Sequence, residues 1–277
     1  MTTVRTFGWR KSLYLVFVLG WSDFSLKYRG SVLGYLWSFL GPLMQFVIIF
    51  AVFRPFVGAR IPHYALYLFL GIIVWEHFAL TTAGCIALPQ EKAGLIQRTR
   101  VPRILLPMIL GWTHAIIFLT RFAVFVMLAM VQGVRPTIVY AYLPLLLLHM
   151  TLLALGVGMA LGAYSLRYRD IAHLWGIALQ MLFWMTPVMY AVDRLPFSRE
   201  VMTFFSAGIP WSPLDAIRAA IRVQPLTLLL HDARRVLLWG AMPSGQHIIF
   251  ATILSGAIFL LGASIFRRRS RYFLQEY

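Results

Sequence analysis

The stretch GSVLGYLWSFLGPLMQFVIIFAVF, residues 30–53, contains no charged side chain and lies between Arg29 and Arg54. A helix needs about 20 apolar residues to cross the hydrocarbon core of a bilayer, which is about 30 Å thick. This stretch is therefore long enough for one crossing, and its two arginines would meet the headgroups on either side. We place the first membrane span at about 32–53.

Apolar runs of similar length follow along the rest of the chain. Glu76 and His77 interrupt the second run, and Arg121 interrupts the third. Together the runs predict six spans, at about 32–53, 64–88, 110–132, 141–165, 171–192 and 247–266. An even number of spans places both termini on the same side of the membrane.

The composition of the whole chain agrees with this interpretation. Its 277 residues are 60% hydrophobic and 12% charged, whereas soluble domains carry about 25% charged residues. The net charge is +16, but most basic residues flank the apolar runs, which favours membrane topology over nucleic-acid binding. Cys85 is the only cysteine, which excludes an intrachain disulfide and a thiolate metal cluster.

Residues 4–28 precede the first span and mix basic residues with aromatic and aliphatic ones. We expect them to form an amphipathic helix lying on the membrane surface. A soluble arm is the alternative. We expect no cleavable signal here, because the apolar piece Leu13–Leu19 is short and no small-residue cleavage site follows it.

Basic residues set the orientation. They are concentrated before span one, between spans two and three, between spans four and five, and after span six, which predicts that both termini are cytoplasmic. Residues 193–246 then form an outer loop, whose own basic residues weaken the contrast. We expect short helices in this loop, one of them amphipathic and starting at Ser212 and Pro213, which resemble a helix start.

Catalytic motifs are absent from the sequence. A P-loop needs G-x-x-x-x-G-K-[ST], and none of Lys11, Lys27 and Lys92 completes it. The sequence has no G-x-S-x-G or H-E-x-x-H motif, and its histidines are scattered singly. We therefore predict no catalytic residue, no metal site and no cofactor in this chain, and expect any ATP to be handled by another chain.

Glu76 and Arg121 lie at similar depths in two successive spans, counted from the outer surface. Either charge alone would be costly in hydrocarbon, so we expect them to form a buried structural ion pair. A functional proton site is the alternative.

Aromatic residues recur along one face of span one and of span five. Sugar rings stack on aromatic side chains, so these stripes are candidates for a glycan translocation path. Packing against a neighbouring helix or lipid is the alternative. The residues are Tyr35, Phe39, Phe46, Phe50, Phe53, Trp175, Phe183 and Tyr190.

Gly158 and Gly162 have the four-residue spacing that lets two membrane helices approach closely. Gly156 lies nearby in the same span. We expect these glycines to pack against another helix.

Three segments carry a resemblance to a known family. The first is KYRGSVLGYLW, residues 27–37, followed by Gly41-Pro42; the second comprises Leu95-Ile96, Val101-Pro102-Arg103, Leu106 and Pro107; the third is Arg167-Tyr168-Arg169-Asp170, followed by Pro187, Val188 and Tyr190. Together they resemble the permease subunits of ABC-2-type exporters of O-antigen, capsular polysaccharide and teichoic acid, over nearly the whole chain. Where that family often has Asn-Pro in the outer loop, this chain has Ser212-Pro213.

The resemblance implies one transmembrane domain over residues 1–277, in the bacterial plasma (inner) membrane. It implies a homodimer of six-span subunits that binds two copies of an ABC ATPase, with ATP and Mg on that partner. The cargo implied is a lipid-linked glycan moved from the inner to the outer face. The residues implied in ATPase coupling are Lys92, Arg98, Arg100, Pro102, Arg103, Arg167, Arg169 and Asp170.

Lys27 and Arg29 are candidates for binding a polyprenyl pyrophosphate headgroup, because their charges would neutralise the diphosphate. Setting the membrane topology explains these two residues about as well. An ABC-2 exporter of a drug or small lipid is an alternative with the same architecture. A membrane-embedded enzyme is a further alternative, which the missing catalytic motifs disfavour.

Overall fold

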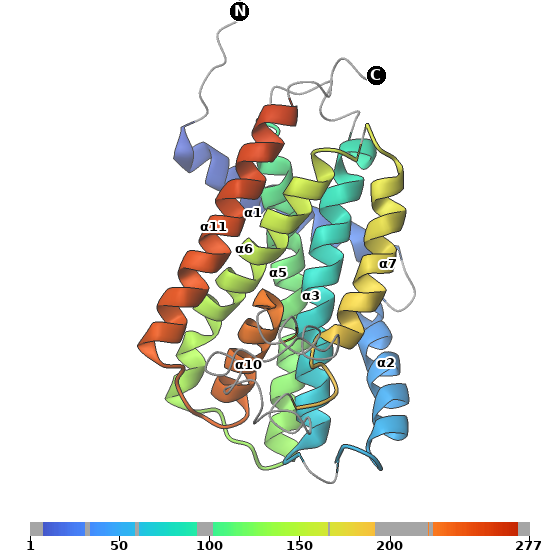
Figure 1. The fold of residues 1–277 in the computed structure, drawn as a ribbon, viewed down its shortest axis with the longest axis vertical. Coiled ribbons are helices and arrows are strands. Elements are labelled where there is room, and N and C mark those ends of the chain that lie inside the picture. Colours follow the sequence, from blue (N-terminus) through green and yellow to red (C-terminus); the bar gives the residue numbers. More distant parts are fainter. Residues whose placement is uncertain are drawn as a thin grey trace, which may run out of the picture.

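The computed structural model describes residues 8–30, 34–58, 61–92, 102–165, 167–191, 221 and 224–270. Regular secondary structure within these residues is entirely helical (Figure 1). The helices are α1 (Trp9–Tyr28), η1 (Gly34–Leu36), α2 (Trp37–Phe53), α3 (Tyr64–Glu91), α5 (Leu105–Val131), η3 (Ile138–Tyr142), α6 (Leu143–Gly162), α7 (Asp170–Met185), α10 (Pro225–Leu237) and α11 (Gly245–Arg269).

Five helices in the described part of the chain are long and apolar enough to cross a membrane. They cover Gly34–Phe53, Tyr64–Glu91, Leu105–Val131, Ile138–Gly162 and Gly245–Arg269. These five correspond to spans one, two, three, four and six of the sequence-based expectation. The expected count of six is not confirmed.

The expected fifth span, 171–192, contains a shorter helix. α7 has 16 residues, and at 1.5 Å per residue it reaches about 24 Å, short of the hydrocarbon thickness. The helix ends at Met185 because Pro187 follows, and the residue before a proline is driven out of the helical region. Thr186 accordingly has extended backbone angles, with φ −78° and ψ 131°.

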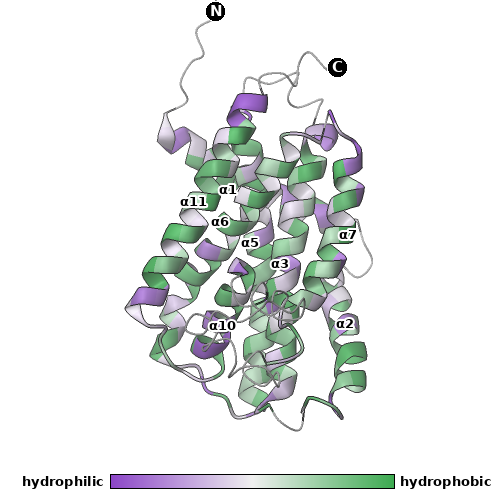
Figure 2. Ribbon diagram, viewed as in Figure 1, coloured by the Kyte–Doolittle hydropathy of each residue, from purple (hydrophilic) through white to green (hydrophobic). Residues whose placement is uncertain are grey.

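α3 is the most enclosed long helix. It contacts α2, α5, α6, α7 and α10, and its residues 66–74 form an almost unbroken buried run. A helix that is apolar on all sides is one that is surrounded by other helices. Figure 1 shows α3, α5, α6 and α11 running lengthwise through the molecule, with α2 and α7 at one edge. Figure 2 shows mostly hydrophobic residues along these helices, with polar residues gathered towards their ends and at a few positions in between.

Glycines bring the backbones of three helices into contact, as expected for Gly158 and Gly162. A Cβ at Gly162 would overlap the carbonyl oxygen of Cys85 on α3, and one at Gly158 would lie 2.7 Å from the Cβ of Cys85. On the α11 side, a Cβ at Gly262 would overlap the backbone of Gly156. α6 is therefore held between α3 and α11 at distances that only glycine permits.

The N-terminal helix is present, but an amphipathic character is not confirmed. α1 crosses behind the bundle at an angle to the long helices (Figure 1) and packs on α5. Phe24 is buried on the protein side, while Leu13, Phe17 and Trp21 are exposed. Apolar side chains thus occupy both faces, and the basic residues Arg10, Lys11 and Lys27 cluster near the helix ends instead of forming a polar face.

The segment expected as an outer loop, 193–246, contains α10, most of whose residues are buried. Leu230, Ala233 and Val236 have no exposed surface, and α10 contacts α3, α6, α11 and η3. The expected helix that starts at Ser212 lies outside the described residues, except for the buried Ile221.

Arg234 holds α10 in this position. Its Nη1 donates to the Tyr67 hydroxyl at 2.6 Å and to the Pro187 carbonyl at 2.7 Å, and its Nη2 donates to the Val188 carbonyl at 2.7 Å. The side chain joins α10, α3 and the segment after α7. It satisfies carbonyl groups that the end of α7 at Met185 leaves without helical partners.

The glycine contacts give a first prediction. Gly262→Ala should lower the free energy of unfolding by about 1–3 kcal/mol, because the added methyl meets backbone that cannot move aside. Thermal unfolding in detergent micelles would measure the change. Gly256→Ala in the same helix is the matched control, because nothing lies within 4 Å of its Cβ position. Equal destabilisation by the two substitutions would refute the close-contact interpretation.

Candidate functional site

Charged residues collect at the end of the bundle where α3 and α6 end, α5 and α7 begin, and α11 ends (Figures 1 and 2). We call this the basic end. Its described charged residues are Glu91, Lys92, Arg103, Arg167, Arg169, Asp170, Arg267, Arg268 and Arg269. It includes every described residue for which the family resemblance implies ATPase coupling.

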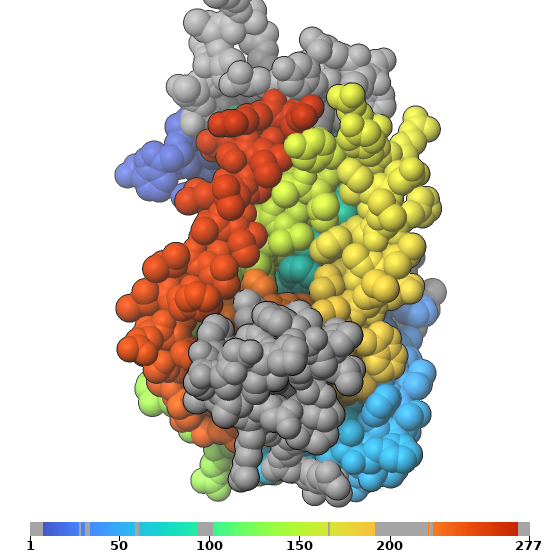
Figure 3. Space-filling view, viewed as in Figure 1, coloured from blue at the N-terminus to red at the C-terminus, as the bar shows by residue number. Residues whose placement is uncertain are grey.

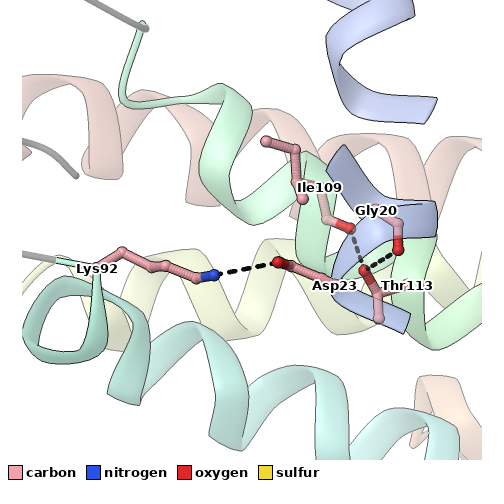
Figure 4. A network of polar contacts seen from close by, with 5 residues as sticks. All are labelled: Gly20, Asp23, Lys92, Ile109 and Thr113. Carbon is pink, nitrogen blue, oxygen red and sulfur yellow. Dashed lines mark hydrogen bonds and ion pairs between the residues drawn. The ribbon is translucent and has the colours of Figure 1, made fainter. Parts of the chain in front are cut away.

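Two polar contacts tie α1 to the basic end (Figure 4). The Lys92 ammonium lies 3.2 Å from the carboxylate of Asp23 on α1. The Thr113 hydroxyl of α5 lies 3.1 Å from the carbonyl oxygen of Gly20 and 3.0 Å from that of Ile109. Gly20 is required here, because a Cβ would lie 2.6 Å from the Trp112 ring. α1 is therefore attached to both α3 and α5.

The other residues expected in coupling have different surroundings. Arg98 and Arg100 lie outside the described residues. Pro102 accepts a hydrogen bond from the Leu105 amide at the start of α5. Arg103 donates to the Ser270 carbonyl at the end of α11, and its partial burial lowers the pKa of its guanidinium.

Three of the expected coupling residues lie where α7 begins: Arg167 and Arg169 precede the helix, and Asp170 is its first residue. Arg167, Arg169 and Asp170 are all exposed. The guanidinium of Arg167 lies 5.5 Å from the ring centroid of Tyr168. Asp170 is in the first turn of α7, where a carboxylate interacts favourably with the helix dipole.

Lys27 and Arg29, the candidate headgroup ligands, are exposed at the end of α1. Partial burial and, to a smaller extent, the positive charge of Arg121 lower the pKa of Lys27. The headgroup role remains a prediction.

The structure brings Glu76 and Arg121 together. Arg121 Nη1 lies 2.6 Å from Glu76 Oε2, and both side chains are largely buried. Arg121 Nε also donates to the Ser38 carbonyl at 2.9 Å, in the first turn of α2. The pair therefore joins α3 to α5, and its arginine also holds the start of α2.

Three of the eight candidate path aromatics pack against aromatic side chains of α3. From α2, Phe46 packs edge-on against Phe69 with centroids 5.5 Å apart, and Phe50 stacks on Tyr64 at 6.0 Å. From α7, Phe183 packs against Trp75 at 5.5 Å. Such contacts are expected if these aromatic residues pack against a neighbouring helix, which was the alternative to a translocation path.

The remaining path candidates differ in their surroundings. The Trp175 indole donates to the Thr82 hydroxyl at 3.0 Å, and the Tyr190 hydroxyl donates to the Met185 carbonyl at 3.0 Å. Phe39 and Phe53 are partly buried. Tyr35 is exposed and stacks on Phe24 of α1 at 5.3 Å. A role in translocation remains a prediction for all eight aromatics.

The outer faces of α2 and α7 carry other apolar side chains, which the sequence reasoning did not select. They lie along the edge of the bundle where Figure 3 shows α7 above α2. Their spacing along the sequence places them on one face of each helix. A single sequence does not tell whether such an apolar face packs inside the protein or lies on its outside. The exposed residues are Trp37, Met44, Ile48, Val52, Leu174, Ile177, Met181 and Trp184.

Three histidine–threonine hydrogen bonds between spans were also missed. His77 and Thr151 join α3 to α6 at 3.0 Å, Thr81 and His114 join α3 to α5 at 3.1 Å, and His149 and Thr252 join α6 to α11 at 3.0 Å. The partners are far apart in sequence, so spacing gave no signal for them. No group of three or more potential metal ligands was found among the residues that the structure describes.

Several long apolar helices, an ion pair buried between two of them and a basic end are the features of a multi-pass membrane protein. Residues 14–207 match the family described as ABC-2 type transporter. The chain belongs to the ABC-2 type transporter family.

Two curated relatives have the same name. The O-antigen export system permease protein RfbA of Klebsiella pneumoniae is 27% identical over 204 residues, which cover 73% of this chain and 76% of the relative. The O-antigen export system permease protein RfbA of Myxococcus xanthus is 22% identical over 254 residues, 92% of each chain. Both relatives are transporter permeases by name.

The buried ion pair gives a second prediction. Glu76→Gln leaves the Arg121 charge without its carboxylate and should destabilise the protein by about 3–5 kcal/mol. The double variant Glu76→Gln, Arg121→Gln removes both charges and should recover part of that loss. Unfolding in detergent would measure the coupling free energy, which we expect to be about 0.5–3 kcal/mol. Additive losses would show that the two side chains do not act as a pair.

The attachment of α1 gives a third prediction. Asp23→Lys and Lys92→Asp each replace an attraction with a repulsion and should speed amide hydrogen exchange in α1 by about two- to fivefold, since a partly exposed pair contributes less than about 1 kcal/mol. The double exchange Asp23→Lys, Lys92→Asp should restore slow exchange. Failure of the double variant to restore protection would rule out a direct ionic link.

Proposed function

We propose that this chain is the transmembrane subunit of an ATP-driven exporter that moves a polysaccharide, such as O-antigen, capsule or teichoic acid, across the plasma membrane. The observation that carries the proposal is the family match over residues 14–207, together with two relatives named as O-antigen export permeases. The second relative is similar over 92% of both chains, which supports a shared architecture and not only one shared segment.

Two copies of this chain form the exporter with two ATPase subunits, which hold ATP and Mg. The basic end, with the coupling residues of the α6–α7 turn and the segment before α5, is the docking surface and is cytoplasmic. The concentration of basic residues at one end supports this orientation. α7 and residues 186–191 after it belong to the remaining crossing, which is the fifth in chain order.

The conduit lies between the two copies. The exposed faces of α2 and α7 are apolar and share one edge of the molecule, which suits a symmetric contact that opens and closes. The cargo is a glycan on a polyprenyl pyrophosphate, which approaches along α1 near Lys27 and Arg29. Two exposed cations there support binding of a diphosphate.

Deletion of the gene in its own organism tests the proposal. The surface polysaccharide should disappear, lipid-linked glycan should accumulate inside, and a plasmid copy should restore export. Gel analysis of surface glycan and extraction of the lipid-linked pool would measure both. An unchanged surface glycan with lost export of a drug or small lipid would favour the alternative class.

Nucleotide turnover provides an independent check. The purified chain should not hydrolyse ATP, and addition of the partner ATPase should give hydrolysis and transport in proteoliposomes. Sustained glycan flux driven by an ion gradient alone would contradict the proposed energy source.

A further inference from the structure

An apolar groove lies between the first residues of α5 and the last turns of α11. Its volume is about 540 Å³, within the range of about 300–1,000 Å³ typical of small-molecule sites. Leu105 and Met108 line it from α5, and Phe259 and Leu260 line it from α11. We call it the α5–α11 groove.

Two arginines form its rim at the basic end. Arg267 and Arg268 line the groove and are exposed. Among the residues that the structure describes, neither has an acidic partner. The neighbouring cations are engaged elsewhere: Arg103 donates to the Ser270 carbonyl, and the Arg269 guanidinium lies 4.9 Å from the Tyr164 ring.

The two rim arginines lie at the end of a membrane span. The apolar stretch of α11 ends at Phe266 and the arginine run begins directly after it. Basic residues that immediately follow a membrane span lie at the headgroup level, and basic pockets between spans bind anionic headgroups. The apolar part of the groove then lies at the depth of the acyl chains.

We propose that the α5–α11 groove binds an anionic phospholipid of the leaflet at the basic end. The phosphate binds Arg267 and Arg268, and an acyl chain lies along Leu105, Met108 and Phe259. The two arginines complement a negatively charged headgroup, and the apolar lining of the groove complements an acyl chain. A second copy of the chain fits less well, because a symmetric contact through this groove brings the same two arginines of each copy together.

This inference rests on the proposed membrane orientation only in placing the basic end at a bilayer surface. It does not depend on the cargo or on the ATPase. A binding experiment on the purified chain therefore separates it from the export proposal, since loss of lipid binding says nothing of glycan export.

Native mass spectrometry of the purified full chain with phosphatidylglycerol and with phosphatidylcholine of the same acyl chains tests the proposal. The wild-type chain should retain phosphatidylglycerol preferentially. Arg267→Gln with Arg268→Gln should weaken phosphatidylglycerol binding by about tenfold or more, as expected for two contributions of juxtamembrane arginines. The same double substitution should weaken phosphatidylcholine binding by a smaller factor, because the choline cation of this lipid offsets the charge of its phosphate.

Arg10→Gln with Lys11→Gln is the matched control, because it removes two exposed positive charges at the start of α1. It should change phosphatidylglycerol binding by less than about twofold. An equal loss in this control would overturn the proposal, because it would show diffuse attraction to net charge.

Leu260→Trp tests the apolar part of the groove. The Leu260 side chain is 68% exposed, so a larger side chain is tolerated there while it fills the groove. It should weaken the binding of both lipids. Unchanged lipid binding, or conversion of a dimer to a monomer by this substitution, would overturn the proposal, the latter by identifying the groove as a contact between copies.

Discussion

A charged side chain in hydrocarbon must find its partners inside the protein, and this constraint fixes how the peripheral helices join the bundle. Arg121 is the clearest case. It binds the Glu76 carboxylate and, through a second nitrogen, the carbonyl of Ser38. The first contact joins two central helices, and the second sets where α2 begins. One buried guanidinium thus positions three helices, because leaving either its charge or its donors unsatisfied would cost several kcal/mol.

Arg234 is also a buried arginine, but its hydrogen-bond partners are neutral groups. The end of α7 at Met185 leaves carbonyl groups of the following segment without helical donors, and those of Pro187 and Val188 are buried. The guanidinium of Arg234 donates to both and to the Tyr67 hydroxyl. A proline in the sequence ends a helix, the buried carbonyls after it need donors, and an arginine on another helix supplies them. The inward position of α10 follows from this chain of requirements.

The sequence predicted what depends on length, hydropathy and local spacing. Five apolar runs became long helices, Gly158 and Gly162 pack against α3, and Glu76 and Arg121 lie in contact because their depths match. What the sequence did not predict depends on partners far along the chain. Residues 225–237 were included in the outer loop because they lie between two apolar runs, and their burial against α3, α6 and α11 depends on contacts far along the chain. The inward direction of Phe46, Phe50 and Phe183 and the outward direction of Ile48 and Met181 depend on where α3 lies. The end of α7 was the exception, because Pro187 was a local signal for it.

The contacts divide the molecule into parts of different rigidity. α3, α6 and α11 touch backbone to backbone at glycine positions, and such an interface has one close-packed arrangement. α2 and α7 instead contact the bundle mainly through α3 and leave an apolar face exposed. α1 is joined to the end of α3 through Asp23 and to α5 through Thr113. In the proposed exporter, a displacement at the basic end therefore reaches α1 directly through Lys92. The α2 and α7 edge has the freedom to separate from a second copy while the α3–α6–α11 core keeps its shape.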